Sequence, residues 1–229
     1  MKPRLQVAAG PLADSIYFLT ESEVRIGRDP SNSLAIGDLS LSRRHCVLSR
    51  RDDGYTLRDL DSFPDDGSRY ELLDGVLLVT PAPALRHELV VAAIVRALNR
   101  YLSPEVAQVF ARGSVEVEPN LHLEPDVLVV PEDQLRHGMD PEARWTAIRS
   151  WWLAVEVSGA GSTPYDRDYK GPAYLALGVR EVWRVDLKDR CVFVSRPGVS
   201  ERRIDEEIVW HPPERPEPFV LSVADLFQS

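Results

Sequence analysis

Apolar and polar residues alternate in short runs over the first 62 residues of the chain. Such runs predict short β-strands, and residues rich in Gly, Pro, Asp and Asn at 10–11, 29–32 and 52–54 mark the turns between them. The strands that we expect are Arg4–Val7, Ile16–Leu19, Glu23–Ile26, Cys46–Ser49 and Tyr55–Leu60. Short strands at this spacing favour an all-β sandwich.

The pattern changes from Tyr70 onward. Two apolar runs, Tyr70–Leu73 and Val76–Thr80, flank Asp74-Gly75 and predict a β-hairpin with a two-residue turn. A helical period then runs from His87 to Leu102. Further strands are expected at Ser114–Val117, Asp126–Val130, Leu153–Val157, Glu181–Asp186 and Cys191–Ser195, and a short helix at Pro172–Leu177. Strands on both sides of helices favour an α/β class with a mixed sheet.

Two segments of the second part carry a weaker pattern. The polar stretch from Pro131 to Ser150 predicts a long connection with one helical turn. The tail from Val199 is charged and rich in proline. It ends in the apolar run Phe219–Phe227, which we expect to dock on the rest of the domain.

Composition narrows the class of protein. Hydrophobic residues make up 44% of the chain and charged residues 28%, as is typical of a globular protein. No apolar run approaches the roughly 20 residues of a membrane-spanning helix, so we expect no membrane partner. The N-terminus lacks the apolar core of a signal peptide, which favours a cytoplasmic location. Cys46 and Cys191 lie far apart, which favours free thiols, and the spacing of a zinc site is absent.

Charge is unevenly distributed along the chain. Residues 1–62 carry nine basic and nine acidic side chains, so the net charge of −9 belongs entirely to residues 63–229. Proteins that bind nucleic acid tightly and without selectivity usually present a basic surface. The acidic balance argues against such binding by the second part, although it leaves room for a local basic channel.

A group of sequence motifs stands in the first part: Ile26-Gly27-Arg28, Ser42-Arg43-Arg44-His45 and Asp59-Leu60-Asp61-Ser62. Together they resemble the forkhead-associated (FHA) family, a β-sandwich that binds phosphothreonine peptides through its loops. The resemblance implies that Arg28, Ser42 and Arg43 meet the phosphate and that His45 braces the loop. Guanidinium and hydroxyl donors suit a phosphate dianion.

The FHA pattern breaks off after Ser62. The family continues with an Asn-Gly-Thr turn, whereas this chain has Asp66-Gly67 and Asp74-Gly75 as its nearest substitutes. A carboxylate near the binding loops would repel a phosphate. We therefore expect an incomplete FHA-like segment at 1–62 that binds a phosphothreonine-containing protein weakly or not at all. The alternative is a β-rich remnant in which Arg28 and His45 serve structure only.

Acidic residues recur at the predicted strands of the second part. Asp126 opens one strand, and Glu156 lies within another between Val155 and Val157. Strand alternation turns Glu156 to the face opposite these valines, where a buried carboxylate is costly unless it is paired or metal-bound. Hydrolysis of a phosphodiester bond calls for a hard cation, and Mg²⁺ takes carboxylate oxygens as ligands.

Four segments, taken in order, resemble the Uma-two family of the PD-(D/E)XK nuclease superfamily over residues 63–229: Arg69–Gly75, Pro125–Val127, Ala154–Ser158 and Asp166–Asp186. The resemblance implies a restriction-endonuclease-like mixed sheet with flanking helices. It implies Glu71, Asp126, Glu156 and Lys170 as catalytic residues, with Asp126 and Glu156 as the ligands of Mg²⁺ or Mn²⁺. The superfamily lysine usually follows the glutamate by two positions; here Ser158 stands there, and Lys170 can reach back to replace it.

The implied function is metal-dependent endonucleolytic cleavage of DNA by a protein that can form a homodimer. The alternative is a non-catalytic interaction protein that recognises a phosphothreonine partner and has a degenerate nuclease fold. Plainer interpretations stay open for single residues, because Glu71 and Lys170 can be solvated side chains and His87 a polar helix end. Trp151, Trp152 and Trp183 favour core packing over base stacking.

Overall fold

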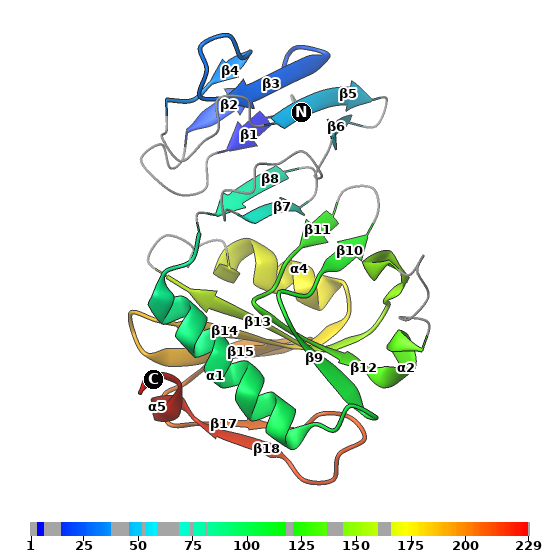
Figure 1. The fold of residues 1–229 in the computed structure, drawn as a ribbon, viewed down its shortest axis with the longest axis vertical. Coiled ribbons are helices and arrows are strands. Elements are labelled where there is room, and N and C mark those ends of the chain that lie inside the picture. Colours follow the sequence, from blue (N-terminus) through cyan, green and yellow to red (C-terminus); the bar gives the residue numbers. More distant parts are fainter. Residues whose placement is uncertain are drawn as a thin grey trace. The chain divides into compact units, whose positions relative to one another are not determined.

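The computed structural model describes residues 4–6, 15–37, 46–51, 54–58, 69–73, 76–80, 82–117, 121–136, 144–159 and 166–228. The chain divides into two compact units (Figure 1). The first consists of residues 1–83 and 117–122, and the second of residues 84–116 and 123–229.

The first unit is built from strands. Its elements are β1 (Arg4–Gln6), β2 (Ile16–Phe18), β3 (Glu23–Gly27), β4 (Leu34–Ala35), β5 (Cys46–Arg51), β6 (Gly54–Arg58), β7 (Arg69–Leu73) and β8 (Val76–Thr80). β3 lies between β4 and β5, and β6 completes this four-stranded sheet, while β1 pairs with β2. The predicted β character of the N-terminal part is confirmed for the described residues.

The hairpin predicted around Asp74-Gly75 forms, because Leu73 of β7 lies opposite Val76 of β8. β11 (Leu121–Leu123) adds to the other side of β7, with Leu121 opposite Leu73. The chain passes between the two units within β10 (Val115–Val117) and within β11.

The second unit is organised around a six-stranded mixed sheet in the order β16-β15-β14-β13-β12-β9. The strands are β9 (Ala107–Ala111), β12 (Val127–Pro131), β13 (Trp151–Ser158), β14 (Val179–Asp186), β15 (Cys191–Arg196) and β16 (Val199–Ile204). Only β13 and β14 among these neighbours run parallel. A parallel pair needs a crossover connection, and this one contains the π-helical turn Asp166–Lys170 (η3) and helix α4 (Gly171–Ala176).

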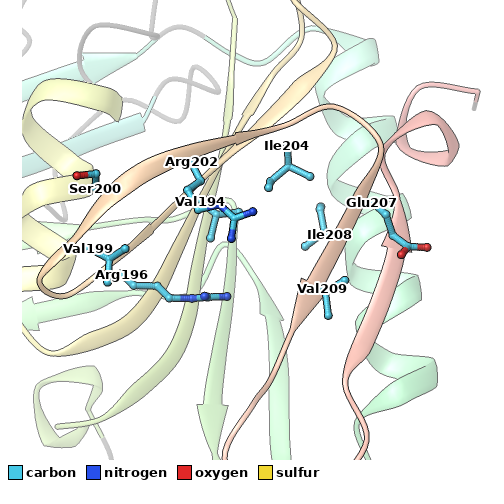
Figure 2. Close-up of a pocket in the computed structure, with 9 residues that line it drawn as sticks. All are labelled: Val194, Arg196, Val199, Ser200, Arg202, Ile204, Glu207, Ile208 and Val209. Carbon is cyan, nitrogen blue, oxygen red and sulfur yellow. The ribbon is translucent and has the colours of Figure 1, made fainter.

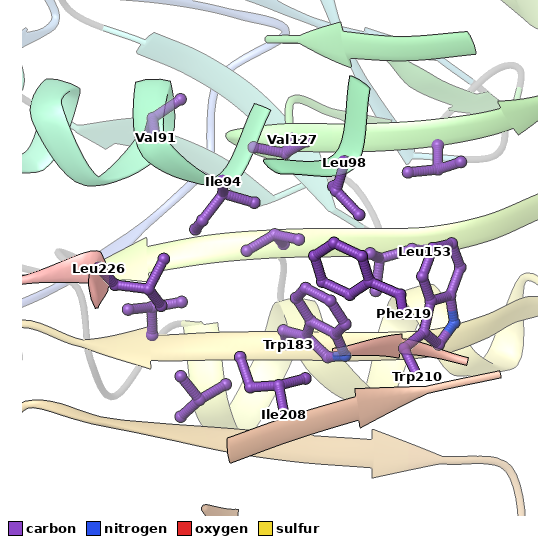
Figure 3. Close-up of a cluster of buried hydrophobic side chains, with 14 of the residues drawn as sticks. Val91, Ile94, Leu98, Val127, Leu153, Trp183, Ile208, Trp210, Phe219 and Leu226 are labelled. Atoms are coloured by element: carbon purple, nitrogen blue, oxygen red, sulfur yellow. The ribbon is translucent and has the colours of Figure 1, made fainter. Parts of the chain in front are cut away.

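One face of this sheet packs against helix α1 (Leu85–Tyr101), whose buried residues Val91, Ile94 and Leu98 recur at helical spacing. They join Leu153 and Trp183 of the sheet in one hydrophobic cluster (Figure 3). The C-terminal elements β17 (Glu207–Trp210), β18 (Phe219–Ser222) and α5 (Val223–Leu226) complete the cluster with Ile208, Trp210, Phe219 and Leu226. The predicted docking of the apolar tail is confirmed.

Strands β16 and β17 form between Val199 and the apolar tail, where the sequence pattern indicated no element. β16 is exposed at every position except Ile204, which is partly buried, and so it carries no apolar alternation by which the sequence could reveal it. The polar stretch 131–150 contains α2 (Glu132–Leu135) and the 3₁₀ turn η2 (Trp145–Ala147), in agreement with a long connection. No helix in the described ranges has both the length and the apolar character needed to cross a bilayer.

Candidate active site

Two neighbouring strands bring Asp126 and Glu156 together. β12 and β13 run antiparallel with Val127 opposite Val155, and Asp126 directly precedes β12. Continuing this register by one residue sets Asp126 opposite Glu156. Val155 and Val157 belong to the cluster under α1, so alternation turns Glu156 to the other face of the sheet, where α4 lies.

The Asp126 carboxylate is held by two donors. It is 1% exposed, and its Oδ2 atom accepts a hydrogen bond of 2.7 Å from the backbone N–H of Val157. His87 Nε2 lies 3.0 Å from the same oxygen. His87 stands in the first turn of α1, one turn before Val91 on the helix face that packs on the sheet. The contact requires a proton on Nε2 when the imidazole is neutral.

The Glu156 carboxylate also meets two donors, both from the crossover between β13 and β14. Tyr174 of α4 donates its hydroxyl proton to Glu156 Oε1 at 2.7 Å, and Lys170 Nζ lies 3.4 Å from the same atom. Tyr174 is fully buried and Lys170 is 4% exposed. The lysine therefore reaches back to the glutamate, as its position in the sequence predicts.

A second buried carboxylate closes the cluster around the lysine. Asp166 Oδ1 lies 3.8 Å from Lys170 Nζ, and Asp166 Oδ2 accepts a hydrogen bond of 2.7 Å from Ser158 Oγ. Asp166 and Lys170 are the first and last residues of the π-helical turn η3. Single π-helical turns inside or beside α-helices are frequent at functional sites. Ser158, two residues after Glu156, thus holds the carboxylate that contacts Lys170.

The oxygen atoms of this cluster suit a hard divalent cation. Asp126 and Glu156 supply carboxylate oxygens, and Mg²⁺ is commonly held by one or two carboxylates while it keeps several waters. Across the ranges that the structure describes, no three His, Cys, Asp or Glu side chains form a metal-binding group. Two carboxylates are the kind of protein ligands that Mg²⁺ or Mn²⁺ takes while it keeps water in its other positions, whereas a zinc site closed by four protein ligands needs more.

The structure thus brings together three of the four predicted catalytic residues, Asp126, Glu156 and Lys170, within the second unit. Glu71 is fully buried on β7, in the first unit, and its role stays a prediction. Arg28 is exposed directly after β3, whereas Ser42, Arg43 and His45 lie outside the described residues.

Sequence reasoning did not find the contacts that Asp166, Tyr174 and His87 make. A signal existed for the first two, since positions 166, 170 and 174 are spaced by four residues and share one side of a helical segment. His87 falls on the apolar stripe of α1, where a polar residue is unusual. The three tryptophans predicted to pack in the core are all buried, at 2% exposure or less.

Two hollows lie on opposite faces of the sheet. One, of about 120 Å³, is formed by β15, β16 and β17 and lined mainly by valine, isoleucine and arginine side chains (Figure 2). Val194 and Ile204 in its wall pack on the cluster under α1, so it lies away from Glu156. The other, of about 240 Å³, has Asp166 in its wall and therefore borders the candidate site.

Comparison with known proteins gives the following matches. A family model described as "Putative restriction endonuclease" (Uma2) matches residues 55–224, and an FHA domain model matches residues 24–63, so the two overlap at 55–63. A crystal structure of a putative nuclease belonging to DUF820 from Anabaena variabilis has a similar fold, with a TM-score of 0.59 and 20% sequence identity over 72% of this chain and 93% of that chain. No curated protein is a significant match.

Proposed function

Because the chain belongs to the Uma2 family of restriction-endonuclease-like proteins, we propose that it is a metal-dependent endonuclease that hydrolyses phosphodiester bonds of DNA. The observation that carries the proposal is the contact of Lys170 Nζ with Glu156 Oε1, at 3.4 Å, beside strand β12, which Asp126 directly precedes. Two carboxylates on adjacent strands can hold a metal ion for hydrolysis of a phosphodiester, and an ammonium group beside them can stabilise charge on the phosphate.

Burial supports a bound cation. Asp126, Glu156 and Asp166 are all exposed by 5% or less, and Lys170 contacts two of them, Glu156 and Asp166. Carboxylates taken out of water are costly unless they are paired or coordinate a metal. In the proposal, Asp126 and Glu156 hold Mg²⁺ or Mn²⁺. When bound, such an ion neutralises charge on the phosphate oxygens and lowers the pKa of a water molecule.

The protein groups have separable tasks in the proposal. His87 Nε2 and the Val157 N–H fix Oδ2 of Asp126, and the Tyr174 hydroxyl fixes Oε1 of Glu156, so both carboxylates are preorganised. The Lys170 ammonium stabilises negative charge on the phosphate and orients the attacking water. Asp166 accepts a hydrogen bond from Ser158 and holds the Lys170 side chain in position for the substrate.

The test is nicking of supercoiled plasmid in Mg²⁺ or Mn²⁺. Loss of a preorganised charge typically costs a factor on the order of 10² to 10³ in rate, so Lys170→Ala should abolish detectable nicking, as should Asp126→Ala and Glu156→Ala. Low salt is the condition of choice, because the net charge of −9 leaves little general attraction to DNA. Lys188→Ala, at an exposed lysine of the same unit, is the matched control and should nick like the wild type.

Metal binding separates the roles further. Calorimetry with Mn²⁺ should show binding to the wild type and to Lys170→Ala, because an ammonium group is not a metal ligand, and weak binding to Glu156→Ala. If wild type and Glu156→Ala bind the ion equally, the assignment of the metal ligands is wrong. If the pure protein leaves duplex DNA, single-stranded DNA and RNA intact with either ion, the interaction-protein alternative replaces the enzyme.

The FHA match supports a second candidate function for the first unit. FHA domains bind phosphothreonine-containing proteins, and Arg28 is exposed just after β3, at the position that the resemblance assigns to phosphate binding. This candidate concerns a partner protein and is compatible with nuclease activity in the second unit. This candidate requires a phosphothreonine peptide to bind in a phosphate-dependent way, against the weak binding that the missing Asn-Gly-Thr turn leads us to expect.

A further inference from the structure

The pocket of about 240 Å³ next to the candidate site has walls of two kinds. Leu175 of α4 and Val182 of β14 give it an apolar side. Arg184, Ser195 and Glu201, from β14, β15 and β16, give it a polar edge, and Asp166 joins it to the site cluster. All of these residues lie in the second unit.

The polar edge places a strong donor beside a strong acceptor. Arg184 is 4% exposed, and its Nη2 atom lies 3.3 Å from Glu201 Oε2. Ser195 Oγ lies 3.3 Å from the other Glu201 oxygen. Both contacts are long for charge-assisted hydrogen bonds, and Nε of Arg184 is buried with no acceptor among the residues that the structure describes. Arg184 Nη1 also lies 3.7 Å from Asp186 Oδ2. The second Nη2 proton of Arg184 and the remaining lone pairs of the Glu201 carboxylate are the donor and acceptor capacity left for a ligand.

Charge in the pocket is balanced, because the cations Arg167 and Arg184 face the anions Asp166 and Glu201. A free phosphate would meet two carboxylates as well as two guanidinium groups, so the lining does not select an anion. The Arg184 guanidinium also stacks over the Phe193 ring, with its carbon 4.0 Å from the ring centroid, which fixes it in the wall. The lining suits an uncharged ligand with both donors and acceptors.

Size and shape narrow the ligand class. The volume is below the roughly 300 to 1,000 Å³ of pockets for drug-sized ligands, so it suits a single ring system. A nucleobase would place its apolar ring face against Leu175 and Val182. Its polar edge would meet Arg184, Ser195 and Glu201. Guanine matches the edge best, because its O6 acceptor adjoins the N1–H and N2–H donors. Arg184 would donate to the O6 atom, and the Glu201 carboxylate would accept from the N1–H and N2–H groups.

We propose that this pocket, between α4 and strands β14 to β16, binds one unstacked nucleobase of the substrate and favours guanine. The inference rests on the proposed nuclease function, because the pocket borders the residues assigned to cleavage. Proteins that recognise single-stranded RNA, and enzymes that modify a base, read an unstacked base through hydrogen bonds to its edge and stacking or apolar contact with its face. The pocket would fix which base lies beside the bond that is cut.

The test measures binding without metal and without cleavage, on the full chain. Calorimetry and saturation-transfer NMR are run with guanosine 5′-monophosphate, adenosine 5′-monophosphate and inorganic phosphate. Guanosine monophosphate should bind on the order of 10- to 100-fold more tightly than adenosine monophosphate, and phosphate alone should not bind in the pocket. Equal binding of the two nucleotides, or binding that phosphate alone reproduces, would overturn the inference.

Two variants locate the binding. Glu201→Gln keeps the shape but replaces an acceptor by an amide, and it should remove the preference for guanine. Leu175→Trp fills the pocket and should block both nucleotides. Glu207→Gln, an exposed glutamate on β17 outside this pocket, is the control and should bind like the wild type. Thermal melts establish that each variant is folded, and unchanged guanine binding in both pocket variants would contradict the assignment.

Nucleotide binding and nicking can be separated by experiment. Lys170→Ala should retain guanine binding while it loses nicking. Nicking by a protein that binds no nucleotide preferentially would overturn the pocket assignment alone. Guanine binding by a protein that cuts no nucleic acid would support the pocket and contradict the nuclease.

Discussion

The Tyr174 hydroxyl is a single group on which the orientation of the Glu156 carboxylate depends, since it donates to Oε1 at 2.7 Å from a fully buried ring. Tyr174→Phe removes this oxygen and keeps the ring. Partners of metal ligands typically contribute a factor of roughly 10 to 100 in metal affinity, so we expect Mn²⁺ binding to weaken by about that factor. Calorimetry measures it, with Tyr169→Phe, at a 51% exposed ring in the same crossover, as the control. Equal loss in the two variants would contradict the role of Tyr174.

Cys46 provides a test of burial in the first unit. Desolvation raises the pKa of its thiol to about 12, because the thiolate is disfavoured away from water. At pH near 8 only on the order of one molecule in 10⁴ then carries the reactive thiolate. We expect iodoacetamide to leave Cys46 unmodified in the native protein and to modify it in urea, as read by mass spectrometry. Equal rates in both states would contradict the burial.

The raised pKa of the Cys46 thiol also makes the stability of the folded state depend on pH. The unfolded thiol loses its proton near its ordinary pKa of roughly 8.5, whereas the folded thiol keeps it. The folded state of Cys46 therefore binds more protons above that pH. Its contribution to stability is fully present below the unfolded pKa and is lost as the pH rises toward about 12.

At the scale of the element, sequence patterns located structure where the pattern was regular. The period of α1 and the turn signal of the β7–β8 hairpin predicted both within two residues. β16 was missed because an exposed edge strand has no buried face to impose alternation. For the candidate site, alternation oriented Glu156 correctly. The contacts of His87 and Tyr174 are tertiary and depend on how α1 and α4 pack on the sheet, which no local pattern encodes.

Helix α1 is the element on which the core of the second unit depends most directly. Leu98 is fully buried in the cluster under the helix, and Leu98→Ala should lower the free energy of unfolding by about 2 to 5 kcal/mol. Arg96→Ala, at an exposed position of the same helix, should change it by less than about 0.5 kcal/mol. Urea unfolding followed by tryptophan fluorescence is selective, because all five tryptophans belong to the second unit. Equal effects of the two variants would contradict the packing.

At the scale of the whole molecule, residues 55–63 fall within both family matches, and one stretch cannot easily complete two cores. The FHA pattern also lacks its Asn-Gly-Thr turn after Ser62. We therefore expect phosphothreonine peptides to bind the chain weakly or not at all on a peptide array. A hit that requires the phosphate and is lost in Arg28→Ala, but kept in the exposed control Arg25→Ala, would overturn this expectation.

Strand β16 ends the six-stranded sheet, and within the described residues no strand pairs with its outer side. An unpaired edge is a template on which another chain can add a strand, and charged side chains are a common protection against this. Arg202 and Arg203 supply that charge midway along the edge. The solubility of the folded protein should therefore depend on these two arginines. Replacing both with threonine would leave Glu201 as the one charged residue of this strand, and on storage the protein would assemble into β-rich aggregates.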